Sequence, residues 1–222
     1  MRTLFRMSGT LFCLLSFLFS ANALQPAETQ PPQEKEPKKA NARAEPAPKP
    51  EPFDGASIEK MAMQCVKLET EAGTIEIEML VEMAPESVRN FLNLASIGAF
   101  DTTTFSRVVP RFVIQGGNLA TRENLTEELY RRAQRTVPDE PSIIKHVRGV
   151  VSLARPEQPN SASSHFFILV GDGTNLDGKF SAFGRVRNGM EVADVINQAA
   201  VDGEKPAKPV RIIRALVKPC AQ

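Results

Sequence analysis

The sequence is poor in the residue types that hold metals or form nucleic-acid interfaces. Its 222 residues include no tryptophan, one tyrosine and two histidines, His146 and His165. No cysteine cluster and no carboxylates at ligand spacing accompany these histidines, so we expect no metal site. Lysine and arginine total 27 against 26 for aspartate and glutamate, a balance that does not favour nucleic acid or a membrane surface as a partner.

Long apolar runs are also missing, which argues against a membrane span in the mature chain. The longest candidate, residues 11–19, follows the basic residues Arg2 and Arg6 and precedes a small-x-small site ending at Ala23. This pattern predicts a signal peptide over residues 1–23, cleaved after Ala23, and a periplasmic or secreted protein. The alternative is a membrane anchor, but a nine-residue apolar stretch is too short to cross the hydrocarbon layer.

Cysteine is scarce as well. Cleavage would remove Cys13 and leave Cys65 and Cys220, near the two ends of the folded part, in an oxidising compartment. These two either form a disulfide that ties the first strand to the last or remain unpaired thiols. Sequence separation alone leaves both alternatives open.

Residues 24–54 consist mainly of proline, glutamate, lysine, alanine and glutamine, with eight prolines from Pro26 to Pro52. Such a segment has too few large apolar side chains to build a core, so we expect a disordered linker over 24–54 that acts as a spacer. Partner binding is the alternative role. The remaining residues, 55–222, are expected to form one domain.

The domain shows mostly strand periodicity. Alternating residues at 63–70 and 74–80, with a turn at Ala72 and Gly73, predict a hairpin. Further strands are expected at 104–109, 112–115, 149–153, 165–170, 182–186 and 210–217.

Two helices are expected beside these strands. One begins at Pro85 and ends before Gly98, and its apolar residues recur every three or four positions; the other spans about 190–198. Residues 118–144 fit neither period and are predicted to be mostly loop, with a helical turn at 124–132 as the alternative. The pattern indicates a mainly β fold, a closed antiparallel eight-stranded β-barrel capped by two α-helices.

The most informative segment is residues 105–117, FSRVVPRFVIQGG, in which a basic residue, an aromatic residue, an amide and a glycine pair fall within one short strand-turn-strand. This segment resembles the signature of the cyclophilins. The similarity continues in order through residues 145–155, 164–168, 176–179 and 183–186, and extends from about Met63 to the C-terminus. The chain is thus similar to an exported bacterial cyclophilin.

The resemblance implies a peptidyl-prolyl cis/trans isomerase that needs no cofactor, acts on proline-containing polypeptides during folding and is a monomer. Rotation about an X-Pro bond crosses a barrier of about 18–20 kcal/mol because the C–N bond has double-bond character. A fixed cation that donates to the prolyl nitrogen would weaken that conjugation, and Arg107 matches the family's cation. Taken by its spacing alone, Arg107 is more typical of a surface ion pair on a strand, and the resemblance reverses that interpretation.

The resemblance also implies roles for nine further residues. Gln115 matches the amide that orients Arg107, Ala154 and Arg155 match the strand end that meets the substrate backbone, and His165 and Phe180 occupy altered positions at the rim. The residues that match the family's proline pocket are Phe112, Val113, Phe167 and Leu176. Ordinary core packing is the alternative for each apolar residue, and it is what we predict for Phe166, since neighbours on a strand face opposite sides. Asn175 replaces the tryptophan that contacts cyclosporin in the family, so tight binding of that drug is not expected.

Two rival functions are weighed against isomerisation. A non-catalytic binding module would hold proline segments in the same groove without accelerating their isomerisation. A serine hydrolase would use Ser163 or Ser164 beside His165, but no nucleophile elbow accompanies them and neighbouring strand residues point to opposite faces.

Overall fold

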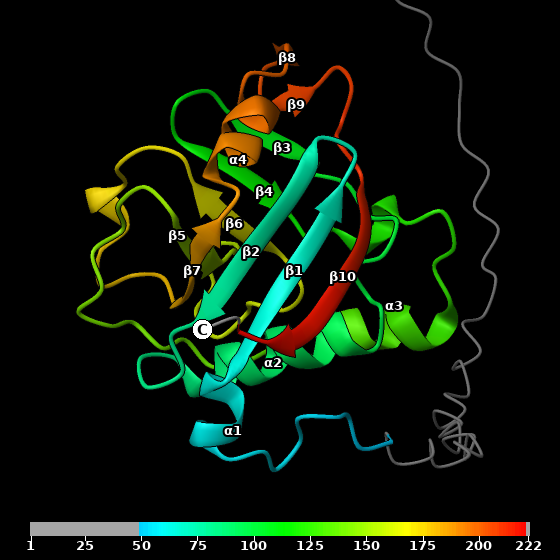
Figure 1. Cartoon of the computed structure of the whole chain (residues 1–222), viewed down its shortest axis with the longest axis vertical. Helices are drawn as coiled ribbons and strands as arrows, with labels where there is room; N and C mark the ends of the chain where they lie inside the picture. Colours follow the sequence, from blue (N-terminus) through cyan, green and yellow to red (C-terminus); the bar gives the residue numbers. More distant parts are fainter. Residues whose placement is uncertain (1–48, 221–222) are drawn as a thin grey trace, which may run out of the picture. The chain divides into compact units, whose positions relative to one another are not determined.

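The computed structural model describes residues 49–220, so the predicted signal peptide and most of the predicted linker lie outside the described residues. The chain folds around one eight-stranded antiparallel sheet (Figure 1). Its strands are β1 (Gln64–Thr70), β2 (Gly73–Met79), β3 (Arg107–Val109), β4 (Val113–Gly116), β5 (Val150–Leu153), β6 (Phe166–Leu169), β7 (Ala182–Asn188) and β10 (Ile212–Pro219). Neighbours in the sheet follow the order β10-β1-β2-β7-β5-β6-β4-β3.

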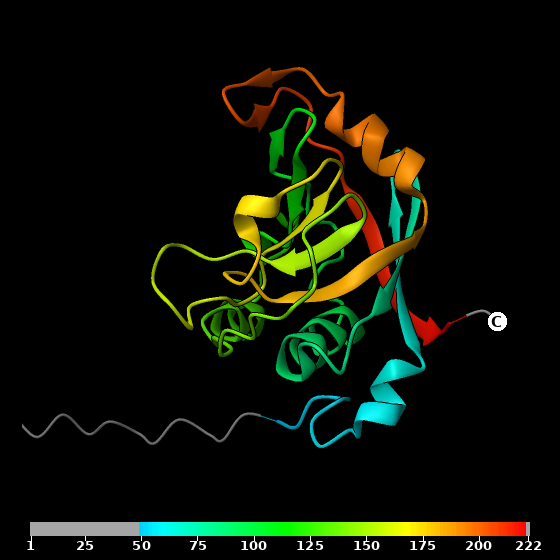
Figure 2. The ribbon, with the colours of Figure 1, turned by 90° about the vertical axis from the view of Figure 1, so that its left-hand side faces the viewer.

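The sheet curls on itself, and the side view shows the strands wrapping around a common interior (Figure 2). Within the described residues, the outer strands β3 and β10 do not pair along their length. The segments just before them meet at one antiparallel bridge between Thr104 and Arg211, beside which Phe105 N donates to Val210 O at 2.9 Å. Strand number and direction are confirmed, and the closure of the predicted barrel consists of this bridge rather than a ladder.

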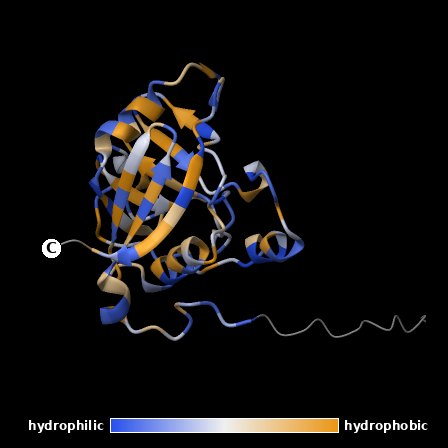
Figure 3. Ribbon diagram, turned by 45° about the vertical axis from the view of Figure 1, so that its right-hand side comes forward, coloured by the Kyte–Doolittle hydropathy of each residue, from blue (hydrophilic) through white to orange (hydrophobic). Residues whose placement is uncertain are grey.

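The predicted hairpin is present as β1 and β2, with its turn at Glu71 and Ala72, one residue earlier than expected. Hydrophilic and hydrophobic residues alternate along the strands that face the viewer in Figure 3. Successive strand residues point to opposite faces, so the apolar side chains of this hairpin share one face. That face is buried in the interior that the curled sheet encloses.

Helices cover the two ends of the sheet, α2 (Pro85–Ser96) at the lower end and α4 (Met190–Asn197) at the upper end in Figure 1. The apolar stripe of α2 faces inward as predicted. Its Phe91 ring packs against the rings of Phe100, Phe166 and Phe183, with centroids 4.7–5.2 Å apart. This aromatic group forms the centre of the hydrophobic core.

Residues 49–220 contain four α-helices where two were predicted. The additional ones are α1 (Ile58–Ala62), which was not predicted, and α3 (Glu127–Ala133), which agrees with the alternative of a helical turn at 124–132. Also unpredicted were the short 3-10 turns η1 (Leu119–Thr121) and η2 (Thr174–Leu176) and a small sheet of β8 (Val201–Asp202) with β9 (Lys205–Pro206). Both extra helices are too short to show an apolar period. Side-chain caps begin them instead: Ser57 accepts from Lys60 N, and Thr126 accepts from Leu129 N at 3.3 Å.

The packed region begins earlier than the predicted boundary at residue 55. Phe53 is 7% exposed and belongs to the hydrophobic core, and its backbone N donates to Asn93 Oδ1 at 2.7 Å. Glu51 forms an ion pair with the buried Arg132 of α3, with Oε1 and Nε 2.5 Å apart. The end of the predicted linker is therefore part of the domain.

The structure joins Cys65, at the start of β1, to Cys220, just beyond β10, in a disulfide with a Cα–Cα distance of 4.9 Å. The bond ties together two neighbouring strands whose cysteines are 155 positions apart in the sequence. Of the helices within residues 49–220, none is long and apolar enough to span a membrane.

Candidate active site

Strands β5 and β6 are buried along their whole length, and β4 is buried except at the half-buried Gln115, which agrees with their nearly continuous apolar sequences. Ile114 and Phe166 point into the barrel interior. A separate apolar group, here called the outer cluster, lies on the opposite face and consists of Val113, Val150, Phe167, Leu169 and Ala182. Phe166 is therefore a core residue, as predicted, while its neighbour Phe167 belongs to the outer face.

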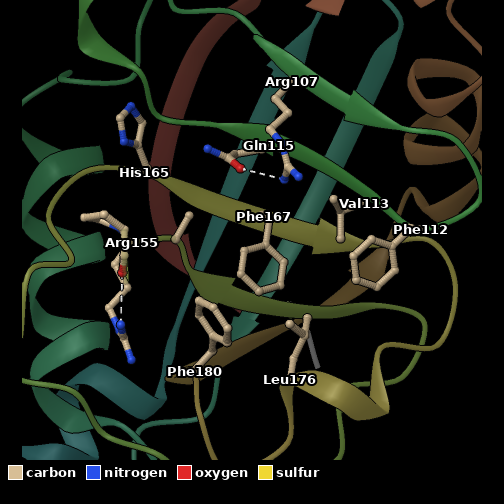
Figure 4. A pocket seen from close by; sticks show the side chains of 11 residues that line it. Arg107, Phe112, Val113, Gln115, Arg155, His165, Phe167, Leu176 and Phe180 are labelled. Carbon is tan, nitrogen blue, oxygen red and sulfur yellow. Dashed lines mark hydrogen bonds between the residues drawn. The ribbon is translucent and has the colours of Figure 1, made fainter. Parts of the chain in front are cut away.

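A pocket of about 450 Å³ lies over the outer cluster (Figure 4). It is lined by Arg107, Phe112, Val113, Gln115, Ala154, Arg155, Pro156, His165, Phe167, Leu176 and Phe180. The structure thus brings all ten residues proposed from the sequence to one place, and adds Pro156. These residues come from three strands and from loops separated by up to about seventy positions.

Strand register places the polar and apolar halves of the pocket side by side. Arg107 on β3 pairs with Gln115 on β4, and Gln115 pairs with Phe167 on β6. Paired residues point to the same face, so the three side chains form a row across the sheet. Arg107 Nη1 donates to Gln115 Oε1 at 3.2 Å, which directs the guanidinium over the pocket (Figure 4).

The apolar floor is centred on Phe167, which is 5% exposed. The ring of Phe180 meets it edge-on at 5.8 Å between centroids, and the ring of His146 stacks on it at 6.5 Å. Phe112 and Leu176 pack against the same cluster from the β3–β4 turn and from η2. Rings held by several neighbours in this way form a defined surface rather than a mobile one.

The β3–β4 turn that carries Phe112 is held by α4. Arg111 adopts a left-handed φ of 61°, an unfavourable conformation for a residue with a side chain. Asn197 stabilises it: its Oδ1 accepts from Arg111 N at 2.7 Å, and its Nδ2 donates to Val109 O and Val113 O at 2.9 and 3.1 Å. Sequence reasoning missed Asn197, although an asparagine on the buried side of an apolar helix was a usable signal.

Arg155 lines the pocket, but its guanidinium is directed away from it. Nη1 donates to the carbonyls of Pro156, Glu157 and Gln158, and Nη2 donates to Lys179 O. The side chain also pairs with Asp139, with Nε and Oδ1 3.0 Å apart. The Arg155 side chain therefore shapes the wall of the pocket, and the strand end at Ala154 and Arg155 lines the pocket. That this strand end meets the substrate backbone stays a prediction.

A serine, a histidine and an aspartate are aligned beneath the floor. Ser152 Oγ lies 3.0 Å from His146 Nε2, and His146 Nδ1 lies 3.3 Å from Asp177 Oδ1. Ser152 is fully buried and His146 is 1% exposed, so a substrate cannot reach the hydroxyl. Burial lowers the pKa of His146 below its ordinary value, which keeps the ring neutral. This group supports Phe167, because Ser152 is the partner of Phe167 across the β5–β6 ladder.

The serines weighed as hydrolase nucleophiles are engaged or buried. Ser163 Oγ donates to Ala133 O at 2.5 Å, and Ser164 is 5% exposed. His165 is exposed at the rim, where partial desolvation lowers its pKa. No arrangement of a nucleophile and a base is formed by these three residues.

Arg107 has a second partner that the sequence did not reveal. Glu204, in the β8–β9 turn, accepts from Arg107 Nε at 2.6 Å through Oε2 and from Nη2 at 3.0 Å through Oε1. These hydrogen bonds from Arg107 lower the pKa of the Glu204 carboxyl. Arg107 therefore forms the ion pair considered as its alternative role and also lines the pocket.

Comparison with known proteins agrees with this architecture. Residues 65–217 match the family model described as "Cyclophilin type peptidyl-prolyl cis-trans isomerase/CLD". Peptidyl-prolyl cis-trans isomerase cypE of Dictyostelium discoideum is 36% identical over 157 residues, which covers 70% of this chain and 98% of the relative. Peptidyl-prolyl cis-trans isomerase A of Dickeya dadantii is 35% identical over 162 residues, or 68% of this chain and 83% of the relative.

A solved structure is similar as well. The cyclophilin type peptidyl-prolyl cis-trans isomerase of Cryptosporidium parvum, crystallised in the presence of the dipeptide ala-pro, superposes with a TM-score of 0.62 at 27% identity, covering 70% of this chain and 99% of that one. The family model spans most of the domain, and the structural neighbour has the same fold. The chain belongs to the cyclophilin family and is a peptidyl-prolyl cis-trans isomerase.

Proposed function

We propose that Arg107 is the catalytic residue and that it accelerates isomerisation by donating to the nitrogen of the prolyl bond. As the X-Pro bond rotates, conjugation is lost and the nitrogen becomes pyramidal and able to accept a hydrogen bond. A donor placed there stabilises the twisted state more than either planar isomer, which lowers the barrier. The guanidinium of Arg107, held by Gln115 beside an apolar pocket, is the observation that carries this proposal.

The proline ring is proposed to sit on the outer cluster, between Phe112, Val113, Phe167 and Leu176. This surface offers apolar contact to a pyrrolidine ring and lies next to Arg107, as the mechanism requires. The ala-pro dipeptide named with the Cryptosporidium parvum structure supports a substrate of this class. No nucleophile and no cofactor takes part, because no covalent bond is made or broken.

We further propose that the enzyme acts on unfolded or flexible chains in a periplasmic or extracellular compartment, as a monomer whose pocket is complete within one chain. Slow X-Pro isomerisation limits folding in such compartments. The Cys65–Cys220 disulfide supports an oxidising environment.

Two experiments test these proposals. Fractionation of cells with an antibody to the mature domain, together with the N-terminal sequence of the product, tests export and cleavage after Ala23. Size-exclusion chromatography with light scattering tests the oligomeric state.

The catalytic proposal is tested by NMR exchange or a protease-coupled assay on a short Ala-Pro peptide. Arg107→Ala should reduce kcat/KM by about 100-fold or more, the loss typical of a transition-state donor. Arg185→Ala, which removes an exposed arginine of β7 outside the pocket, is the matched control and should retain the rate of the natural protein. Equal rates for Arg107→Ala and the control would reject the catalytic role and favour the binding-module alternative.

A further inference from the structure

Arg107 is held by two groups that reach it from different parts of the chain. Gln115 lies opposite it on the neighbouring strand β4, whereas Glu204 reaches it from the β8–β9 turn, 97 residues away in the sequence. Glu204 makes the shorter contacts, 2.6 and 3.0 Å against 3.2 Å for Gln115. The position of the guanidinium therefore depends on a segment outside the pocket lining.

The hydrogen bonds use three of the five N–H donors of the guanidinium. Glu204 takes Nε–H and one hydrogen of Nη2, which together form one edge of the planar group, and Gln115 takes one hydrogen of Nη1. One N–H on Nη1 and one on Nη2 remain for a substrate. A prolyl nitrogen needs one such donor, so the ion pair leaves the catalytic function of Arg107 intact.

A single hydrogen bond to Gln115 would leave the guanidinium able to rotate. The Arg107 side chain is long and 39% exposed, so it has many rotamers open to it in water. A carboxylate bound to two nitrogens of the fork fixes the plane of the group as well as its position. Glu204 thus supplies an orientation that Gln115 alone cannot.

The carboxylate itself is presented from a fixed backbone. Glu204 O accepts from Val108 N at 2.8 Å, one residue along β3 from Arg107. Pro206 of β9 is buried, and the turn between β8 and β9 contains Gly203 at a left-handed φ of 62°. The turn is therefore docked on β3, the strand that carries Arg107.

The negative charge of Glu204 opposes the field of Arg107 at the substrate, but this effect is weaker than the effect of Glu204 on the orientation of the guanidinium. The Glu204 side chain is 55% exposed, so water screens its charge. Its oxygens also lie on the edge of the guanidinium away from the remaining donors. Orientation of a hydrogen bond acts at contact distance and is not screened in this way.

We propose that Glu204 is a positioning residue for catalysis, which holds the Arg107 guanidinium in the plane that aims its remaining N–H groups at the prolyl nitrogen. This inference rests on the proposed catalytic role of Arg107. It predicts that loss of the carboxylate slows the step on the enzyme and leaves the affinity for peptide nearly unchanged, since the apolar pocket that binds proline is untouched.

The test uses Glu204→Ala, Glu204→Gln and the control Asp202→Ala, which removes an exposed acid from the same hairpin. An NMR exchange titration with an Ala-Pro peptide separates affinity from the on-enzyme rate. Glu204→Ala should lower that rate about five- to tenfold. Glu204→Gln retains one acceptor oxygen and should be intermediate, and Asp202→Ala should match the natural protein.

A spectroscopic readout distinguishes positioning from a loss of folding. The ¹⁵Nε–H cross-peak of Arg107, assigned by its disappearance in Arg107→Lys, should weaken and broaden in Glu204→Ala as the N–H loses its protection from solvent exchange, while backbone spectra stay native-like. An unchanged cross-peak and rate would overturn the inference, and a faster rate would make Glu204 an inhibitory latch instead. If Arg107→Ala also retained full activity, the catalytic proposal itself would fail; if only Glu204→Ala did, the inference alone would fail.

Discussion

Phe166 and Phe167 are neighbours on β6 but belong to different parts of the molecule. Phe166 is fully buried in the barrel interior, among the rings of Phe91, Phe100 and Phe105. Phe167 faces the opposite side and forms the pocket floor. Because side chains alternate along a strand, one short segment supplies both a core and a binding surface. The interior should therefore determine stability, and the outer face should determine catalysis.

Exchanging the two phenylalanines for alanine should separate these properties most clearly. Phe166→Ala leaves a cavity in the core and should lower the free energy of unfolding by about 3–5 kcal/mol. Phe167→Ala removes an apolar contact worth about 1.5–3 kcal/mol, so it should weaken kcat/KM about 10- to 100-fold with a smaller loss of stability. Urea unfolding and the peptide exchange assay measure the two effects. Equal stability losses for both variants, with activity kept in Phe167→Ala, would contradict the division between the faces.

Removal of the disulfide tests whether stability can be lowered while the pocket residues stay unchanged. Cys65→Ser with Cys220→Ser removes a cross-link over 155 positions, and the free energy of unfolding should fall by about 2–4 kcal/mol. Well below its melting temperature, the folded variant should isomerise peptide at the natural rate, since neither cysteine lines the pocket. A slower rate in protein shown to be folded would mean that the two regions are coupled through β1.

Asn197 joins the two regions, so its replacement should affect both to a moderate degree. Asn197→Ala leaves Arg111 N and two carbonyls without their partner, at a cost of about 1–3 kcal/mol. Loss of these bonds should also loosen Phe112 and weaken peptide affinity. Asn197→Asp keeps the acceptor for Arg111 N and should be milder in calorimetry and in peptide titration. Native-like affinity in Asn197→Ala would show that α4 does not position the turn.

The smallest expected effect is a pH dependence of stability that arises beneath the pocket floor. Burial holds the folded pKa of His146 below its ordinary value of 6.5, so the unfolded chain binds the extra proton first as the pH falls. The stability from neutral His146 is complete above about pH 6.5 and is lost as the pH falls from there toward the folded pKa. Urea midpoints between about pH 7.5 and about pH 5.5 should decline less in His146→Gln. His165→Gln measures the share of the second histidine, and an unchanged slope in His146→Gln would rule out this source.

Local sequence pattern predicted most of the fold, and the family resemblance predicted the pocket. Alternation located the first hairpin and placed Phe166 in the core, short β-rich runs located the other six strands, and the resemblance to the cyclophilins led to the ten residues that the structure brings together. The partners of individual side chains were harder to predict: the sequence did not show that the Arg155 donors go to neighbouring carbonyls. The contact of its strand end with the substrate backbone stays a prediction.

The two supports of the site, Glu204 and Asn197, were missed. A buried asparagine on an apolar helix indicates that it has a partner, but it does not indicate which one. Glu204 and Asn197 contact the β3–β4 region from 97 and 88 residues away, and no local period encodes a contact over that distance. Of the two extra helices, α1 was missed and α3 was weighed only as an alternative to a loop, for a different reason. They are short and rely on caps and ion pairs, such as Arg132 with Glu51, rather than on an apolar stripe.

Arg107 is proposed to act on the rotating bond and not on the affinity for proline. Peptide affinity and on-enzyme exchange rate, measured by NMR for the natural protein and Arg107→Ala, test this role most directly. We expect an affinity within about threefold of natural and an exchange rate lower by about 100-fold or more. An affinity that falls as steeply as the overall rate, with the on-enzyme step unchanged, would make Arg107 a binding residue and contradict its catalytic role.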